Sequence, residues 1–324
     1  MAKYILRRIL LMIPVLIGIS LVVFTLVSIS PGDPVEMLVG ARASEEAKEA
    51  VRQDLGLDRP FWIRYFDYMK DVVTGDFGTS WRTKLPVTEE IWERFGTTVE
   101  VALGALTLTV LIGIPIGVIS AVKQYSLLDN VTLVMALFLS SMPGFWLGTM
   151  LLLVFALHMK LLPVTFQGDF RSYILPCIVL AAGQMAGIVR NTRSNMLEVI
   201  RADYIKMARA KGANEVRVVM GHALRNALLP IITLLGMNFV SMLGGAAVIE
   251  QVFTIPGLGF LALTSIQQLD APMVMGEVLF LAILAGVTNL VIDVVYVYID
   301  PRLKSRYVKP RRRKHQEVEA ESHG

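Results

Sequence analysis

Residues 203–230 have the sequence DYIKMARAKGANEVRVVMGHALRNALLP, and they belong to a polar, basic segment that extends from residue 191 to residue 230. On both sides of this segment the chain is almost unbroken hydrocarbon. Such a contrast predicts an amphipathic insertion held beside a bilayer, where another protein can bind it.

The spacing of apolar residues predicts two short helices within the insertion. Asn195 gives an N-cap signal with an acid three residues later, Glu198, as in a capping box. Gly212 is expected to break the first helix, and Pro230 to open the next apolar run. Apolar positions recur at helical spacing on both sides of the break: Leu197, Ile200, Tyr204 and Met207 before it, and Val216, Val219, Met220, Ala223 and Leu224 after it.

The rest of the chain has the composition of a membrane protein with several spans. Hydrophobic residues make up 54% of its 324 residues, and the mean hydropathy is +0.59. The apolar blocks approach or exceed the ~20 residues that cross ~30 Å of hydrocarbon. The first five blocks contain no Asp, Glu, Lys or Arg, whereas the sixth contains Glu277 and Asp293. The predicted spans are residues 9–30, 101–122, 130–157, 173–189, 229–249 and about 272–299.

The distribution of Lys and Arg predicts the orientation, because positive charges beside spans resist translocation. Six spans place both termini on one side, and most basic residues near the spans lie on that side. The loop of residues 31–99 lies opposite, and loops of this length are largely exempt from the rule. We therefore expect the termini and the insertion to be cytoplasmic. The basic residues on that side are Lys3, Arg7, Arg8, Lys123, Arg190, Arg193, Arg201, Lys206, Arg209, Lys211, Arg217, Arg225 and those of the tail from Arg302 to Lys314.

Several function classes are excluded by what the sequence lacks. It has no G-x-x-x-x-G-K-[ST], H-E-x-x-H or C-x-x-C motif, and its four histidines are scattered, so we expect no nucleotide site, no metal site and no catalytic group. The single cysteine, Cys177, excludes a disulfide framework. The first apolar run is too long for a signal peptide, and the pI near 9.1 reflects membrane-flanking charges rather than nucleic-acid binding. The spans also lack the dense ionisable groups of ion-coupled carriers.

The insertion resembles the cytoplasmic EAA loop of ABC importer permeases, in the form typical of the dipeptide and oligopeptide (peptide/nickel) subfamily. The resemblance lies in residues 203–212 (DYIKMARAKG) and 222–230 (HALRNALLP). It implies an all-α integral membrane protein with six transmembrane helices in the type I importer (MetI-like) permease fold, with a small extracytoplasmic insertion after the first helix. Further similar motifs are PGDP at 31–34, LGLDRP at 55–60, GDFGTS at 75–80, PGLG at 256–259 and DPR at 300–302.

One position departs from the general EAA pattern. The pattern begins with Glu six residues before the glycine, where this chain has Lys206 and then Met207; the peptide subfamily commonly departs there too. The resemblance implies a coupling helix seated in a groove of a cytoplasmic ATPase subunit, with small residues for close approach and basic residues for charge-assisted bonds. The alternative is a basic helix lying on the lipid surface. The implied coupling residues are Asp203, Tyr204, Ala208, Arg209, Ala210, Lys211, Gly212, His222, Ala223, Leu224, Arg225 and Asn226.

The loop of residues 31–99 is long enough for a small folded cap. An acidic, helix-forming stretch at residues 43–55 precedes an aromatic run at residues 61–68. We expect this loop to help dock an extracytoplasmic binding protein; the alternative is an aromatic belt that lies on the bilayer. The candidate docking residues are Glu45, Glu46, Glu49, Trp62 and Tyr65.

Polar groups in the later spans are candidates for lining the pathway, because such groups at membrane depth usually face a cavity or a partner. For Glu250 and Glu277, near the external surface, simple solvation is an equal expectation, and Asp293 is expected to pair with a basic residue near the cytoplasmic end. Prolines and glycines within the spans, such as Pro143 and Gly144, are expected to serve helix packing. The candidate pathway residues are Gln184, Asn238, Ser241, Glu250 and Asn289.

The resemblance also implies partners. These are a second homologous permease, two ATP-binding subunits that use ATP and Mg²⁺, and an extracytoplasmic substrate-binding protein, in a bacterial or archaeal cytoplasmic membrane; this chain itself would bind no cofactor. Short peptides are the expected substrates, with nickel chelates, glutathione or another small solute as alternatives. An ATP-independent channel or secondary carrier is the alternative from a different class. The expected divisions are residues 1–30 (N-terminus and first helix), 31–99 (external loop), 100–300 (five-helix core, with the coupling loop at 191–228) and 301–324 (basic cytoplasmic tail).

Overall fold

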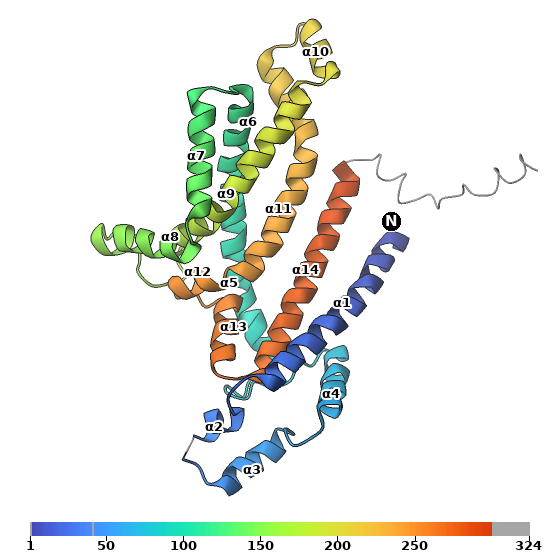
Figure 1. Ribbon diagram of the computed structural model, residues 1–324, viewed down its shortest axis with the longest axis vertical. Helices are drawn as coiled ribbons and strands as arrows, with labels where there is room; N and C mark the ends of the chain where they lie inside the picture. Colours follow the sequence, from blue (N-terminus) through green and yellow to red (C-terminus); the bar gives the residue numbers. More distant parts are fainter. Residues whose placement is uncertain (1, 41, 300–324) are drawn as a thin grey trace, which may run out of the picture.

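The computed structural model describes residues 2–40 and 42–299, and within these ranges its regular structure is helical (Figure 1). Long helices stand side by side, and shorter helices cluster at both ends of the bundle. In the described ranges, the β pairing is limited to an isolated bridge between Thr79 and Pro86. The predicted basic tail, from residue 301, lies outside the described residues. Below, the "α10 end" is the upper end of the bundle in Figure 1, and the "α13 end" is the opposite end.

Five described helical runs are long and apolar enough to cross a bilayer, and a bent helix pair supplies a sixth if it counts as one span. The six predicted apolar blocks correspond to these runs. In hydrocarbon the backbone must satisfy its own polar groups, which is why apolar blocks of this length become helices. The long runs are α1 (Ala2–Ile29), α5 (Val87–Leu108) continued through η1 (Thr109–Gly113) into α6 (Ile114–Val122), α9 (Phe170–Ile200), α11 (Arg225–Gly245) and α14 (Ala271–Ile299).

Shorter helices connect the long runs. Those between α1 and α5 lie at the α13 end, whereas α10 projects beyond the bundle at its own end (Figure 1). The short elements are α2 (Pro34–Val39), α3 (Glu45–Asp54), α4 (Phe61–Val73), α7 (Leu127–Ser141), α8 (Gly144–Leu151), η2 (Leu152–His158), α10 (Asp203–Ala210), η3 (Arg217–Leu224), α12 (Ala247–Val252) and α13 (Leu258–Gln267).

The third predicted span, residues 130–157, is not one straight helix. It bends by 97° between α7 and the run from Gly144 to His158. Pro143 causes the break, because proline lacks a donor and excludes the preceding residue from helical backbone; Met142 is accordingly extended. After the bend, Gly144 and Gly148 allow α8 to pack closely against Ile249 and Phe253, which corrects the expectation of packing within one continuous span.

The second spanning helix begins earlier than predicted, at Val87 rather than at residue 101. Pro86 precedes its first turn and Glu89 and Glu90 lie within it, where acidic groups favour the positive end of the helix dipole. Glu90 is buried and accepts a hydrogen bond from the Thr83 hydroxyl. Hydropathy missed this start because the first turns of the helix are polar.

Helix α9 is the centre of the bundle, since it contacts α5, α6, α7, α8 and α11. Its approach to α6 requires a residue without a side chain at position 117. A Cβ on Gly117 would lie 2.6 Å from Cβ of Thr192 and 2.9 Å from the carbonyl oxygen of Val189. In a bilayer, burial of apolar side chains gives little driving force for helix association. Close backbone packing of this kind is therefore a main source of stability between helices.

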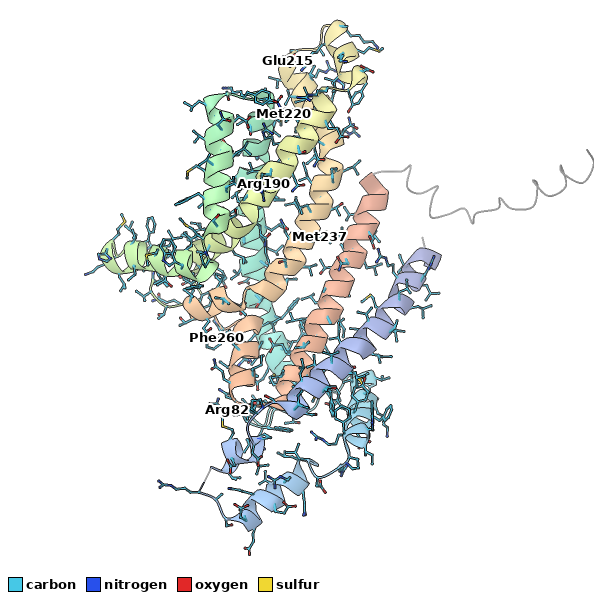
Figure 2. The ribbon with its side chains drawn as sticks, viewed as in Figure 1. Arg82, Arg190, Glu215, Met220, Met237 and Phe260 are labelled. Carbon is cyan, nitrogen blue, oxygen red and sulfur yellow. The ribbon has the colours of Figure 1, made fainter. Side chains whose placement is uncertain are left out.

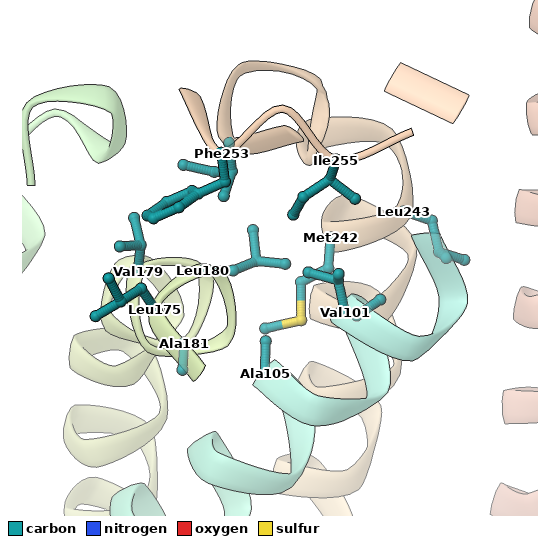
Figure 3. Close-up of a cluster of buried hydrophobic side chains, with 12 residues drawn as sticks. Val101, Ala105, Leu175, Val179, Leu180, Ala181, Met242, Leu243, Phe253 and Ile255 are labelled. Carbon is teal, nitrogen blue, oxygen red and sulfur yellow. The ribbon is translucent and has the colours of Figure 1, made fainter. Parts of the chain in front are cut away.

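A cluster of buried apolar side chains connects the middle of the long helices to the short segments at the α13 end (Figure 3). Val101 and Ala105 of α5 face Leu180 of α9 and Met242 of α11, and Ile255 closes the cluster from the α13 end. This packing holds the short helices α12 and α13 against the long ones.

We predict that Gly117→Ala destabilises the protein by about 1–3 kcal/mol, because a methyl group would overpack the contact between α6 and α9. Gly96→Ala is the matched control: it also lies within a helix, but a Cβ added there would have no neighbouring atom within 4 Å, so alanine should be neutral or slightly stabilising. Thermal unfolding of the detergent-solubilised protein measures both effects. Equal melting temperatures for the two variants would contradict this account of the contact.

Candidate functional site

The predicted coupling segment forms a projection at the α10 end. Helix α10 is short, and Gly212 follows it with φ +80°, a left-handed conformation that favours glycine. The predicted break at Gly212 is therefore confirmed. The predicted second short helix is not separate, because η3 continues directly into α11 and Pro230 lies inside that helix. A proline removes one backbone bond, which does not end a helix that is supported by its neighbours.

The predicted N-cap at Asn195 is wrong. Asn195 lies inside α9, and its side-chain amide donates to the carbonyl of Asn191 at 2.8 Å. Helix α9 continues to Ile200 because Thr192 and Met196 on its inner side are fully buried. The insertion therefore begins as a direct extension of the central helix.

The inner side of the projection is anchored in the bundle by apolar contacts. Ile205 of α10 and Val218 and Ala223 of η3 are fully buried in one cluster with residues of α6 and α9. The outer side carries four exposed large apolar residues. Tyr204 and Met207 lie on α10, Met220 lies on η3, and Val216 directly precedes η3. Figure 2 shows Met220 and Glu215 at this end. An anchored base with an exposed apolar surface is typical of a docking element.

An ion pair across the turn at Gly212 joins α10 to the segment that follows. Arg209 Nε donates to Oε1 of Glu215 at 2.8 Å, and a second guanidinium nitrogen donates to Oε2 at 3.2 Å. The bond from Arg209 lowers the pKa of Glu215. Arg209 thus braces the loop itself, and its side chain is still 38% exposed. Lys211 and Arg225 are exposed.

A buried ion pair behind the projection was missed by the sequence analysis. Asp129, at the start of α7, is 1% exposed and accepts two bonds from Arg193 of α9, at 2.7 and 2.8 Å. The hydroxyl of Ser120 and the backbone N–H of Tyr125 also donate to it. The pair ties the α6–α7 turn to α9 close to the projection. The available signal was an acid in the first turn of an apolar run, which requires a partner.

At the α13 end, Glu250 and Glu277 are fully buried, so the expectation of solvation is wrong. Glu250 accepts from the Thr98 hydroxyl at 2.7 Å and from the backbone N–H of Phe260 at 2.9 Å, and Thr98 itself accepts from Leu258 N–H at 2.8 Å. These bonds give partners to backbone N–H groups in the first turn of α13, which have none within the helix. Within the described part of the chain, neither carboxylate oxygen of Glu277 has a hydrogen-bond partner.

The five pathway candidates do not share one environment. Asn238 is buried, Gln184 is half-buried, and Ser241 and Asn289 are exposed. Glu250 supports the start of α13 and is fully buried, so it is not a lining residue. The prediction for Asp293 is confirmed, since it lies 2.7 Å from a guanidinium nitrogen of Arg8.

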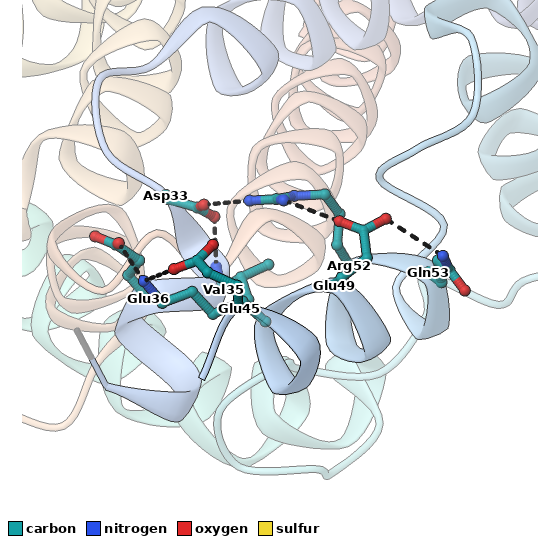
Figure 4. A network of polar contacts seen from close by, with 8 residues as sticks. Asp33, Val35, Glu36, Glu45, Glu49, Arg52 and Gln53 are labelled. Atoms are coloured by element: carbon teal, nitrogen blue, oxygen red, sulfur yellow. Dashed lines mark hydrogen bonds and ion pairs between the residues drawn. The ribbon is translucent and has the colours of Figure 1, made fainter. Parts of the chain in front are cut away.

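The acidic residues at the start of the loop of residues 31–99 are largely engaged with their own neighbours (Figure 4). Lys48 contacts Glu36 and Glu45 at 3.0 and 3.1 Å, and Arg52 contacts Glu49 at 3.2 Å and Asp33 at 2.6 Å. Asp33 also caps α2 by accepting from Val35 N–H. These pairs hold α2 and α3 together as one unit.

Two aromatic docking candidates lie one turn apart on α4, with ring centroids 6.3 Å apart, but differ in exposure. Tyr65 is 5% exposed, packs on Phe24 of α1 and hydrogen-bonds Ser20 Oγ at 2.9 Å, so its assignment to a docking surface is wrong. Trp62 is 57% exposed, and Glu46 is exposed on α3. A surface candidate therefore remains at Glu46 and Trp62.

Comparison with known proteins decides the family. Residues 113–305 match the model of the binding-protein-dependent transport system inner membrane component, and residues 1–102 match the model of the N-terminal part of such membrane components. The chain belongs to this family. It is a permease subunit of an ABC importer, a transport component that does not itself catalyse a reaction, and family membership implies ATPase and partner subunits.

Relatives of this permease are similar over nearly their full length. It is 39% identical to the dipeptide transport system permease protein DppB of Alkalihalophilus pseudofirmus, over 94% of this chain and 100% of the relative. It is 40% identical to the oligopeptide transport system permease protein AppB of Bacillus subtilis, with the same coverage. It is 38% identical to the glutathione transport system permease protein GsiC of Salmonella typhimurium, over 94% and 99%.

The fold also matches a solved transporter. A chain of the inward-facing MetNI methionine ABC transporter superposes with a TM-score of 0.55 at 18% identity, over 66% of this permease and 96% of that chain. The predicted fold class, an all-helical permease of the MetI type, is confirmed.

We predict that Asp129→Asn destabilises the permease by about 3–5 kcal/mol, because it leaves the partly buried Arg193 without its counter-charge. Asp203→Asn removes the exposed pair with Lys206 and should change stability by no more than about 1 kcal/mol. Thermal unfolding in detergent compares the two variants. An unchanged melting temperature for Asp129→Asn would show that the pair does not secure α7 to α9.

Proposed function

We propose that this permease forms half of a translocation pathway for short peptides and that the projection from Asp203 to Asn226 couples it to a cytoplasmic ATPase. The observation that carries the proposal is a projection with a buried base, an internal ion pair and an exposed apolar face. A helix that only rests on lipid needs neither the rigid base nor the brace at Gly212.

The proposal places the α10 end in the cytoplasm of a bacterial or archaeal cell. Lys123, Arg190 and Arg201 lie toward that end beside the spanning helices, in agreement with the positive-inside rule. Both chain termini would then be cytoplasmic. The basic tail would add to the same side, although it lies outside the described residues.

The mechanism follows from the connections of the projection. Two ATP-binding subunits use ATP and Mg²⁺, and their closure displaces the grooves that hold the coupling elements. The displacement enters α9 and α11, which flank the projection, and the Asp129–Arg193 pair carries it to α6 and α7. The pathway then opens to alternate sides by rigid-body movement against a second, homologous permease.

Short peptides are the proposed substrates because relatives at 39% and 40% identity are named as dipeptide and oligopeptide permeases. Glutathione is the second candidate, since a relative at 38% identity is named for its transport. In either case, an extracytoplasmic binding protein is proposed to deliver the solute and set most of the specificity.

Coupling is tested by placing a charge on the exposed apolar face. We predict that Met207→Glu and Met220→Glu each lower ATP-driven peptide uptake by roughly tenfold in proteoliposomes, because a carboxylate would be buried in the docked groove. Leu127→Glu is the control, because Leu127 is also exposed at the α10 end but is the first residue of α7, outside the projection. Uptake equal to the control would contradict coupling through this face. Uptake by the permease alone, without ATPase subunits, would favour a channel or carrier.

Binding-protein docking is proposed at the unit of α2 and α3 with the exposed side of α4. We predict that Glu46→Lys raises the binding-protein concentration for half-maximal ATPase stimulation by roughly threefold to tenfold, since charges at an interface rim control association. Lys160→Glu serves as a charge-reversal control at an exposed position outside residues 31–99. No effect of Glu46→Lys would contradict docking at this surface. Weaker membrane association of α4 in Trp62→Ser would then indicate that the aromatic residues lie on the bilayer.

A further inference from the structure

A cleft of about 490 Å³ lies between α5 and the start of α9. Its volume falls within the range of small-molecule sites. Most of its walls are apolar. Its lining residues are Glu100, Gly104, Thr107, Leu108, Phe170, Tyr173, Ile174, Cys177 and Ile178.

One charged group faces this cleft among its described lining residues, the exposed carboxylate of Glu100. It accepts a hydrogen bond from the Tyr173 hydroxyl at 2.5 Å. Tyr173 is itself held by an edge-to-face contact with Phe166, with ring centroids 5.1 Å apart. The carboxylate is therefore positioned at the mouth of the cleft rather than free to rotate.

The inner wall of the cleft is formed by a close approach of two helices. A Cβ on Gly104 of α5 would lie 2.5 Å from Sγ of Cys177 on α9. The thiol of Cys177 lies 3.6 Å from the carbonyl oxygen of Val101. Gly104 and Cys177 thus form a close-packed part of the cleft wall, and Glu100 lies one helical turn from Gly104 on α5.

The position of Glu100 decides which occupant fits. Glu100 lies in the spanning helical run Val87–Val122, directly before its apolar block of residues 101–122. A carboxylate at the edge of such a block is stabilised by water or by a positively charged partner, not by hydrocarbon. A lipid tail in the cleft would offer the carboxylate no positive partner, whereas a cation with an apolar body would interact with both the carboxylate and the apolar walls.

We propose that this cleft is a transient site for the α-ammonium end of a short peptide as it crosses the permease. Glu100 supplies the counter-charge, Tyr173 positions it, and the apolar walls accept the first side chain. The peptide identity rests on the proposed function, whereas the preference for a cation rests only on the cleft.

The cation preference is measurable with a thiol at Thr107, which lines the cleft and is exposed; Thr107→Cys is placed in a Cys177→Ser background, because Cys177, the one cysteine of the chain, is buried. The full transporter, without substrate, is treated with a cationic or an anionic methanethiosulfonate, and labelling of this subunit is followed by mass spectrometry. We expect the cationic reagent to react roughly tenfold faster, as one nearby unit charge would cause. Glu100→Gln should abolish the difference, and Glu93→Gln, an exposed position outside the cleft on the same helix, should keep it.

The peptide assignment is tested by protection in the same preparation. A peptide with a free α-ammonium, delivered with its binding protein during turnover, should slow the labelling of the thiol at position 107 when Glu100 is present but not in the Glu100→Gln variant. Equal rates for the two reagents, or no labelling by either, would overturn the cation site. A charge preference without protection would overturn the peptide assignment alone. Failure of peptide uptake by the wild-type transporter would instead overturn the proposed function.

Discussion

The close packing of α9 against α5 and α6 is the contact on which the rest of the permease depends. Gly104 and Gly117 let the backbones approach so closely that a methyl group at either position would collide with α9. Because α9 also contacts α7, α8 and α11, this contact sets the position of most of the bundle. It also positions the projection, since α9 leads directly into it.

Polar contacts complete the architecture where apolar packing cannot. At the α10 end, Asp129 and Arg193 tie α7 to α9. At the α13 end, Glu250 and Thr98 connect the first turn of α13 to α5. Both sites bury a carboxyl group, and hydrogen-bond donors converge on each of the two and offset the cost of its burial. The helices at the two ends of the bundle are thus positioned by hydrogen bonds and an ion pair. The helices in the middle are positioned by the close packing of apolar side chains and glycines.

Much of the fold could be predicted from the sequence, because hydrocarbon leaves the backbone few choices. The long apolar blocks, the break at Gly212 and the resemblance to importer permeases all correspond to observed features. Errors occur where local signals compete with tertiary contacts. Asn195 has the residue type of an N-cap, but burial of Met196 keeps α9 helical beyond it. Pro143 bends a run that hydropathy treats as continuous.

The functional residues were predicted less completely than the helices. Candidate residues of the projection could be singled out because they are contiguous in sequence. Glu100, Asp129 and Arg193 were not, since their roles arise from neighbours on other helices. Glu250 was found but given the wrong environment, because its burial depends on the turn formed by Gly257 and Leu258, where a side chain on Gly257 would collide with its carboxylate.

The bend at Pro143 has a consequence for the surrounding membrane. Helix α7 has 15 residues, so it is about 22 Å long, which is short of the ~30 Å hydrocarbon thickness. Hydrophobic mismatch of this size requires the bilayer beside α7 to thin, or another protein to replace it there. Helix α8 turns away almost at a right angle and exposes Phe145 and Trp146, side chains suited to the headgroup level of a locally thinned leaflet.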